Sequence, residues 1–223
     1  MYKRDFFEWI HNFKVLMSNW ALFIVIFASL FVWPFFGGAV QEVVFDLFIS
    51  AVIILSVFAV AGERNNRQVF QFGITIAALW LTRLIEMPLL NGILRFVVII
   101  YFISVVFMFI KLVYQRVNVD KYVIIEAVNG YLLLGIGFSL LVAFSNIYFP
   151  NAFSFKLPPD GSVSYDPIYF SFVTLTTLGY GDKLPISDVA KSVSLLITLS
   201  GQFYLVTIMA FIVGKMLAKR NDK

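Results

Sequence analysis

The chain of 223 residues has no cysteine and few charged side chains. The absence of cysteine excludes disulfide bonds and thiolate metal sites, and it leaves the redox compartment undetermined. Charged residues make up 13% of the chain, against roughly 25% in a typical soluble domain. That is too few to cover a water-exposed surface, while 61% of the residues are hydrophobic. The composition therefore indicates an integral membrane protein.

The small excess of basic residues fits a membrane protein better than a nucleic-acid-binding protein. The net charge is +4, from 17 Lys and Arg against 13 Asp and Glu, and the cytoplasmic loops of membrane proteins are commonly basic. The sequence shows no constellation of catalytic side chains. We therefore expect neither an enzyme, nor a cofactor, nor a nucleic-acid partner.

Six apolar runs have about the length that a membrane-spanning helix needs. They cover residues 19–36, 43–61, 68–85, 93–114, 122–149 and 186–217, and the third is the least apolar. A semi-apolar piece, 165–178, lies between the last two runs and is too short to span, so we expect it to be re-entrant. The pattern predicts an all-α membrane protein with six transmembrane helices.

Six spans place both termini on one side of the membrane, and the loop charges indicate which side. Of the 17 Lys and Arg residues, five would lie opposite the termini, which leaves twelve on the side of the termini; the five are Arg83, Arg95, Lys156, Lys183 and Lys191. Because basic loops stay inside, we expect a multi-pass protein of the plasma (inner) membrane with cytoplasmic termini. The re-entrant piece then enters from outside.

The segment 173–182 reads VTLTTLGYGD, which suits neither a helix nor a strand. Irregular backbone is tolerated at membrane depth only where it is buried in protein or lines water. Glycines there permit dihedrals that aim neighbouring carbonyls at one axis, where they replace the hydration shell of a cation. A short helix over about 167–176 would turn the negative end of its dipole toward the membrane centre, which favours a cation there.

The run from Thr177 to Asp182, TLGYGD, resembles the selectivity-filter signature of the potassium channels. The order of elements over about 122–217 is also similar: an apolar helix, an outer loop, a pore helix, the filter and a second apolar helix. The resemblance implies that K+ and the similar Rb+ bind the filter while Na+ is rejected. It also implies a homotetramer with four-fold symmetry, because one chain supplies one filter strand.

The resemblance carries specific roles over to the filter residues. The ion ligands would be the backbone carbonyls of Thr177, Leu178, Gly179 and Tyr180, together with the Thr177 hydroxyl. The carbonyl of Gly181 would receive ions at the outer mouth. The tyrosine and the preceding apolar residue are expected to point outward and pack behind the strand.

Supporting residues flank this segment. Tyr169 and Phe170 stand where many relatives have an aromatic pair on the pore helix, although Phe170 cannot donate the hydrogen bond of an indole. Thr176 and Asp182 border the filter. Val173 replaces a glutamate that pairs with the filter aspartate in some relatives, so we expect weak inactivation of the kind that relies on that pair.

Lys183 directly follows the signature. Four copies would ring the outer mouth with positive charge, offset by Asp182 and Asp188. Alternatively, Lys183 points sideways into solvent or lipid headgroups, which we favour.

The last apolar run contains Gly201, at a position where the potassium channels often have a hinge glycine. One helical face beyond it carries Gln202, Leu205 and Met209, which would line the cavity and the inner gate. The same stripe is equally compatible with packing, and Gln202 with a hydrogen bond to a neighbouring helix.

Residues 19–114 occupy the place of a voltage-sensing domain without carrying its charges. The fourth run has Arg95 near its outer end and Lys111 near its inner end, with no charged residue between them. A steep sensor needs about 3–4 gating charges per subunit. Arg95 and Lys111 are better interpreted as anchors at opposite membrane faces, and we expect little voltage dependence.

This interpretation divides the chain into five segments. They are a cytoplasmic amphipathic segment (1–18), a voltage-sensor-like four-helix domain without gating charges (19–114), a linker (115–121), a pore domain (122–217) and a short cytoplasmic tail (218–223). Basic residues near the inner leaflet follow the ordinary rule for cytoplasmic loops or, alternatively, bind anionic lipid: Lys111, Arg116, Lys121, Lys215, Lys219, Arg220 and Lys223.

The sequence thus predicts a K+-selective channel that conducts passively with weak or no voltage dependence. Three alternatives are a non-conducting or modulatory channel subunit, a voltage-gated relative with a degenerate sensor, and a secondary K+ transporter. The intact filter argues against a silent subunit. The single filter-like segment argues against a transporter, which usually carries several such repeats.

Overall fold

The computed structural model describes the backbone of residues 2–36, 39–60, 66–84, 87–115, 121–149, 151–157 and 164–221. In the described residues the regular elements are helices. One isolated β-bridge pairs Phe153 with Pro185, outside the helices. The helical elements are α1 (Tyr2–Phe31), the 3-10 turn η1 (Trp33–Phe35), α2 (Ala39–Ala59), α3 (Asn66–Leu84), α4 (Pro88–Gln115), α5 (Lys121–Tyr148), α6 (Asp166–Leu175) and α7 (Asp188–Asn221).

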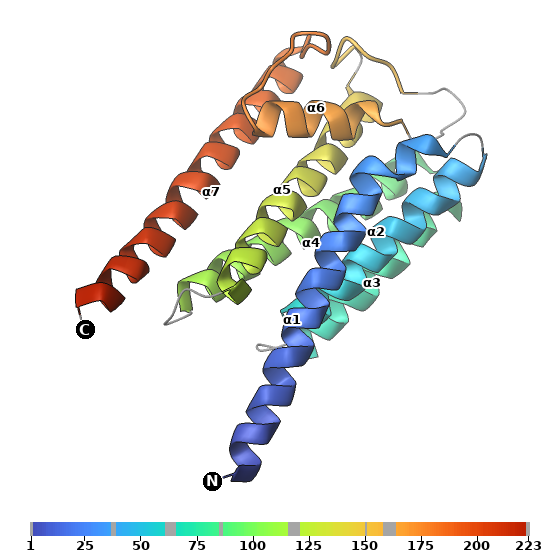
Figure 1. The fold of residues 1–223 in the computed structure, drawn as a ribbon. Helices are drawn as coiled ribbons and strands as arrows, with labels where there is room; N and C mark the ends of the chain where they lie inside the picture. The colour runs from blue at the N-terminus through green and yellow to red at the C-terminus, as the bar shows by residue number, and fades with distance from the viewer. Residues whose placement is uncertain are drawn as a thin grey trace.

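The long helices run lengthwise, with both chain ends at one end of the molecule and α6 at the other (Figure 1). The helix α6 is 10 residues long and packs on both α5 and α7. Its range agrees with the short helix expected at about 167–176. Pro167 lies in its first turn, where a missing N–H leaves no helical hydrogen bond unmade.

Four stretches are long and apolar enough to cross a membrane: Leu16–Phe35, Leu89–Gln115, Val123–Tyr148 and Asp188–Leu217. Two shorter apolar stretches, Val43–Ala59 and Phe70–Thr82, belong to α2 and α3. Among the described residues, four of the six expected spans therefore have the length and composition for crossing.

Two expected segment boundaries fall inside continuous helices. α1 starts at Tyr2 and runs through residue 18 without a break, and α7 continues past residue 217 to Asn221. The first and last transmembrane runs are thus extended by helix at the end of the molecule that holds the termini.

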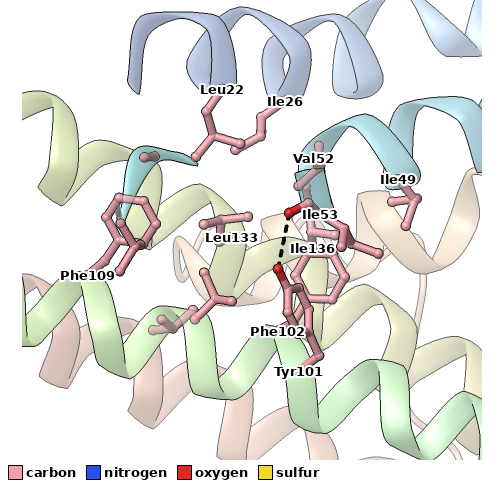
Figure 2. Close-up of a cluster of buried hydrophobic side chains, with 14 of the residues drawn as sticks. Leu22, Ile26, Ile49, Val52, Ile53, Tyr101, Phe102, Phe109, Leu133 and Ile136 are labelled. Carbon is pink, nitrogen blue, oxygen red and sulfur yellow. Dashed lines mark hydrogen bonds between the residues drawn. The ribbon is translucent and has the colours of Figure 1, made fainter. Parts of the chain in front are cut away.

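One apolar core joins helices from both halves of the chain (Figure 2). Leu22 and Ile26 of α1 face Val52 and Ile53 of α2, while α4 and α5 close the cluster from the other side. The members from those two helices include Phe102, Phe109, Leu133 and Ile136, each no more than 2% exposed. The expected sensor-like and pore segments therefore share a core within one chain.

Buried polar side chains link the helices through this core. The Tyr101 hydroxyl of α4 donates to the Ile53 carbonyl of α2 at 3.1 Å and lies 2.8 Å from the Ser56 hydroxyl (Figure 2). The Asn129 amide of α5 donates to the backbone oxygen of Asn19 in α1 at 2.9 Å and to its side-chain oxygen at 3.2 Å. Such bonds hold helices together where apolar packing gives no solvent-driven force.

We expect Asn129→Ala to lower the free energy of unfolding by about 0.6 kcal/mol and by no more than about 1.7, because interhelical hydrogen bonds within membranes contribute about that much. The measurement is unfolding of purified protein in mixed detergent micelles. Ser139→Ala is the matched control, since Ser139 is also buried on α5 but donates to Ile136 of its own helix. Equal effects from both variants would contradict a role for the contact with α1.

Candidate functional site

The helix α6 is held against α5 by side-chain hydrogen bonds and a glycine. The fully buried Ser171 donates its hydroxyl hydrogen to the Gly135 carbonyl at 2.8 Å. A Cβ at Gly135 would overlap the ring of Phe172, so only glycine lets α5 approach this closely. The Tyr131 hydroxyl of α5 also donates to the Leu175 carbonyl, at 3.3 Å, at the end of α6.

Gly201 brings α7 against the end of α6. It is buried, and a Cβ there would overlap the Leu175 carbonyl oxygen and lie 2.9 Å from the Leu175 Cδ1. This close approach gives Gly201 a packing role in addition to the hinge role that the resemblance implied. Gln202, Leu205 and Met209 lie on an exposed face of α7 in the single chain.

The amides that follow α6 turn back onto its last carbonyls. Thr177 N donates to Thr174 O at 3.0 Å, and the amides of Leu178 and Gly179 donate to Val173 O at 3.0 and 3.3 Å. Every peptide bond described is trans, so the C=O that shares a peptide plane with each N–H points the opposite way. The carbonyls of Thr176, Thr177 and Leu178 therefore point away from α6.

Left-handed backbone recurs at every second residue of this segment. Thr177, Gly179 and Gly181 have φ of 59°, 56° and 80°, whereas Leu178 and Tyr180 do not have positive φ. Glycine adopts such values without strain, but Thr177 is β-branched and pays a conformational cost there. In an extended strand successive carbonyls alternate in direction, and reversing the sign of φ at alternate residues removes that alternation.

The segment 176–182 is exposed on the single chain. Leu178 and Tyr180 were expected to pack behind the strand, but 55% and 67% of their surfaces are exposed. Neither α5 nor α6 of the same chain covers the two side chains, so their packing behind the strand stays a prediction. Only a surface outside the single chain would bury them.

The supporting residues contact the segment from α6. Asp182 raises the pKa of Tyr169, chiefly through side-chain hydrogen bonding, with smaller contributions from desolvation and from negative charge. The Thr176 hydroxyl donates to Phe172 O at 2.7 Å and so closes the last turn of α6. The interaction of Asp182 with Tyr169 is a detail that the sequence did not identify.

Phe170 lies in a different environment from its expected partner Tyr169. It is 4% exposed and packs edge-on against Phe153, with ring centroids 5.0 Å apart, and against Phe155 at 6.0 Å. Both partners come from the segment 151–157 that precedes α6. Phe170 thus anchors the segment 151–157 on α6.

Lys183 takes neither of the two expected positions. Its Nζ lies 3.1 Å from Asp166 Oδ1 in the first turn of α6 and 5.6 Å from the centre of the Phe155 ring. Asp188, expected as one offsetting charge, pairs with Lys191 at 3.2 Å. The pairing of Lys183 with Asp166 was not predicted from the sequence, although an acidic residue in the first turn of a helix is a usual stabilising feature.

Backbone pairing explains why Lys183 faces α6. Ser154 N donates to Leu184 O and Leu184 N to the Ser154 hydroxyl, both at 2.8 Å. Ile186 N donates to Ala152 O at 2.8 Å. The chain after the segment 176–182 is thus folded back along residues 151–157.

At the end that holds the termini, Lys215 contacts α4 directly. Its ammonium donates to the carbonyls of Val113 and Tyr114 at 2.9 and 2.6 Å. Lys111 is exposed. The other basic side chains expected at the inner leaflet lie outside the described side chains: Arg116, Lys121, Lys219, Arg220 and Lys223.

Backbone oxygens are the candidate cation ligands of this site. Among the side chains that the structure describes, no group of three or more His, Cys, Asp or Glu could hold a metal ion. The segment 176–182 instead offers carbonyls that point away from α6 and the hydroxyl of Thr177. Such neutral oxygens suit a weakly held, dehydrated cation.

The region around this site is similar to a known protein family. Residues 136–219, which make up less than half of the chain, match a family model described as "Ion channel". The match includes all of α6, the segment 176–182 and most of α7. Neither the comparison with curated proteins nor that with solved structures found a match. The match and the apolar helices indicate a multi-pass membrane protein with a region similar to ion channels.

We expect Gly201→Ala to lower the free energy of unfolding in mixed micelles by about 1–3 kcal/mol, the usual cost of overpacking, because the new methyl group must displace the end of α6. Gly214→Ala on the same helix is the control, since a Cβ there meets nothing within 4 Å. That substitution should stabilise by about 0.5–1 kcal/mol. Stabilisation by both substitutions would contradict the close contact between α6 and α7.

Proposed function

We propose that this chain is the subunit of a homotetrameric, K+-selective channel that conducts passively. The carbonyls of Thr177, Leu178, Gly179 and Tyr180, with the Thr177 hydroxyl, would bind the permeant ion. The observation that carries the proposal is the backbone of 177–179, whose amides are engaged by α6 while carbonyls of the same segment point away from it. The family match covers the same residues.

The chemistry of such a row fits a dehydrated monovalent cation. Carbonyl oxygens replace water around the ion without binding it too tightly to leave, which conduction requires. Left-handed backbone at Gly179 and Gly181 keeps these oxygens in a row, and both glycines avoid the strain that a side chain would add. K+ rather than Na+ follows from the resemblance of TLGYGD to the potassium-channel signature.

The homotetramer is supported by two features of the single chain: its one filter strand and its exposed apolar side chains. One strand cannot surround an ion, and Leu178 and Tyr180 stay exposed without a neighbour. The helix α7 also exposes large apolar side chains over much of its length, including Leu195, Phe203 and Val206, each more than 60% exposed. Four copies around one axis would close the ring of oxygens and cover parts of these surfaces.

The helix α4 supports a channel with weak or no voltage dependence. Arg95 Nε donates to Asn91 Oδ1, 2.7 Å away and one turn earlier in the same helix. Between Arg95 and Lys111 the helix has no charge to move. The hydrogen bond from Tyr101 to α2 further ties α4 to its neighbour.

Ion selectivity is tested with purified protein in liposomes under a K+ gradient. We expect the reversal potential to follow K+ alone, and Gly179→Ala to abolish the flux because alanine is strained at φ of 56°. Gly214→Ala, which meets nothing within 4 Å, should retain it. Absence of flux from the unmodified chain would support a silent subunit, and a reversal potential that follows protons or Na+ would support a coupled transporter.

Voltage independence is tested by single-channel recording in symmetric K+ without blocking divalent ions. A charge that crosses the whole membrane is worth about 2.3 kcal/mol per 100 mV, or roughly fiftyfold in an equilibrium constant. With no such charge in α4, we expect the open probability to change by less than about twofold over the same interval. A steep relation between conductance and voltage would overturn this expectation.

A further inference from the structure

Two neighbouring residues that follow the filter segment bind the same face of α6. Lys183 pairs with Asp166 at 3.1 Å, and Asp182 interacts with Tyr169, whose pKa it raises. Asp166 and Tyr169 are three positions apart, so they lie side by side on the helix. The outer end of the filter segment is therefore attached to the first turns of α6, while its inner end is attached to the last turn.

The ion pair has a more defined environment than a pair on an open surface. Both side chains are 31% exposed. The Lys183 ammonium also lies over the ring of Phe155, which is 4% exposed and packs on Phe170 of α6. Asp166 lies where the partial positive charge of the helix N-terminus favours an acidic side chain. Three attractions therefore fix the position of the pair.

The same point joins three segments of the chain. Residues 151–157 pair with the backbone after the filter through Ser154 and Leu184, and Phe155 belongs to that segment. Lys183 extends from the returning chain to α6. Loss of the ion pair would release the returning chain from the first turn of α6.

We propose that Lys183 and Asp166 form a latch that holds the outer end of the filter in its conducting conformation. Both are positioning residues, because they act on the ion ligands through the backbone of 180–183. The role in conduction rests on the proposed function. The latch contact itself does not depend on that function, so the two can be tested separately.

A latch and a simple ring of charge at the mouth predict different effects of Lys183→Met and Asp166→Asn on the current. If Lys183 acted only by repelling K+, Lys183→Met would raise the single-channel current and Asp166→Asn would lower it. If the two form a latch, both variants impair the filter in the same direction. We expect each to speed the decline of K+ current in low external K+ by roughly two- to fivefold, in the range of a partly exposed ion pair.

The pair Lys191 and Asp188 provides matched controls. It lies 3.2 Å apart in the first turn of α7, its side chains are 57% and 99% exposed, and it bridges no separate segments. Lys191→Met and Asp188→Asn change the charge at the same end of the molecule. We expect the rate of current decline in both variants to lie within the scatter of the unmodified channel. The exchanged pair Asp166→Lys with Lys183→Asp should recover part of the loss. Opposite effects of Lys183→Met and Asp166→Asn, or no effect of either, would overturn the latch.

Hydrogen exchange tests the latch independently of conduction. In detergent, followed by mass spectrometry, we expect the peptide that spans 180–186 to exchange two- to fivefold faster in Lys183→Met and in Asp166→Asn than in the two controls. Unchanged exchange in both latch variants would overturn the proposal even if the channel conducts. If the unmodified chain carries no K+ current but exchange responds as expected, the contact stands and the proposed function fails.

Discussion

The site depends on how the carbonyls at the end of α6 are satisfied. The last four carbonyls of any helix lack partners within the helix, and at membrane depth an unsatisfied one is costly. Here residues 172–175 all find donors: the Thr176 hydroxyl, the amides of 177–179 and the Tyr131 hydroxyl. Because those amides are used, carbonyls of the following segment turn outward. The need of the last α6 carbonyls for hydrogen-bond donors therefore produces the row of outward-pointing oxygens.

Close packing around α6 makes that arrangement possible. Gly135 on α5 and Gly201 on α7 let the two long helices approach α6, and both positions would overlap it if they carried a Cβ. Ser171 adds a buried hydrogen bond on the α5 side. The segment 151–157 and the chain after residue 182 complete the support through the aromatic contacts of Phe170 and the ion pair of Lys183. The exposed segment 176–182 is thus held by the closely packed helices α5, α6 and α7 and by residues 151–157.

The helices that precede α5 act as a scaffold on the same chain. α1, α2 and α4 share an apolar core with α5 (Figure 2), and Asn129 and Tyr101 add polar links through it. Lys215 of α7 donates to the carbonyls of Val113 and Tyr114 near the end of α4, so the C-terminal part of α7 also touches this scaffold. Tight coupling and the absence of charge between Arg95 and Lys111 of α4 are consistent with a peripheral domain that acts as a support.

The sequence by itself determined the helical membrane class, the short helix before TLGYGD and the glycines of that segment, because hydrophobic run length and backbone permissiveness are local properties. It did not reveal the interaction of Tyr169 with Asp182, the ion pair of Lys183 with Asp166 or the close contact at Gly201. These were decided only by the tertiary structure, since each joins segments whose relative position depends on packing. Phe170 illustrates the difference. The sequence shows that it is aromatic, but its partners Phe153 and Phe155 were determined by how residues 151–157 pack on α6.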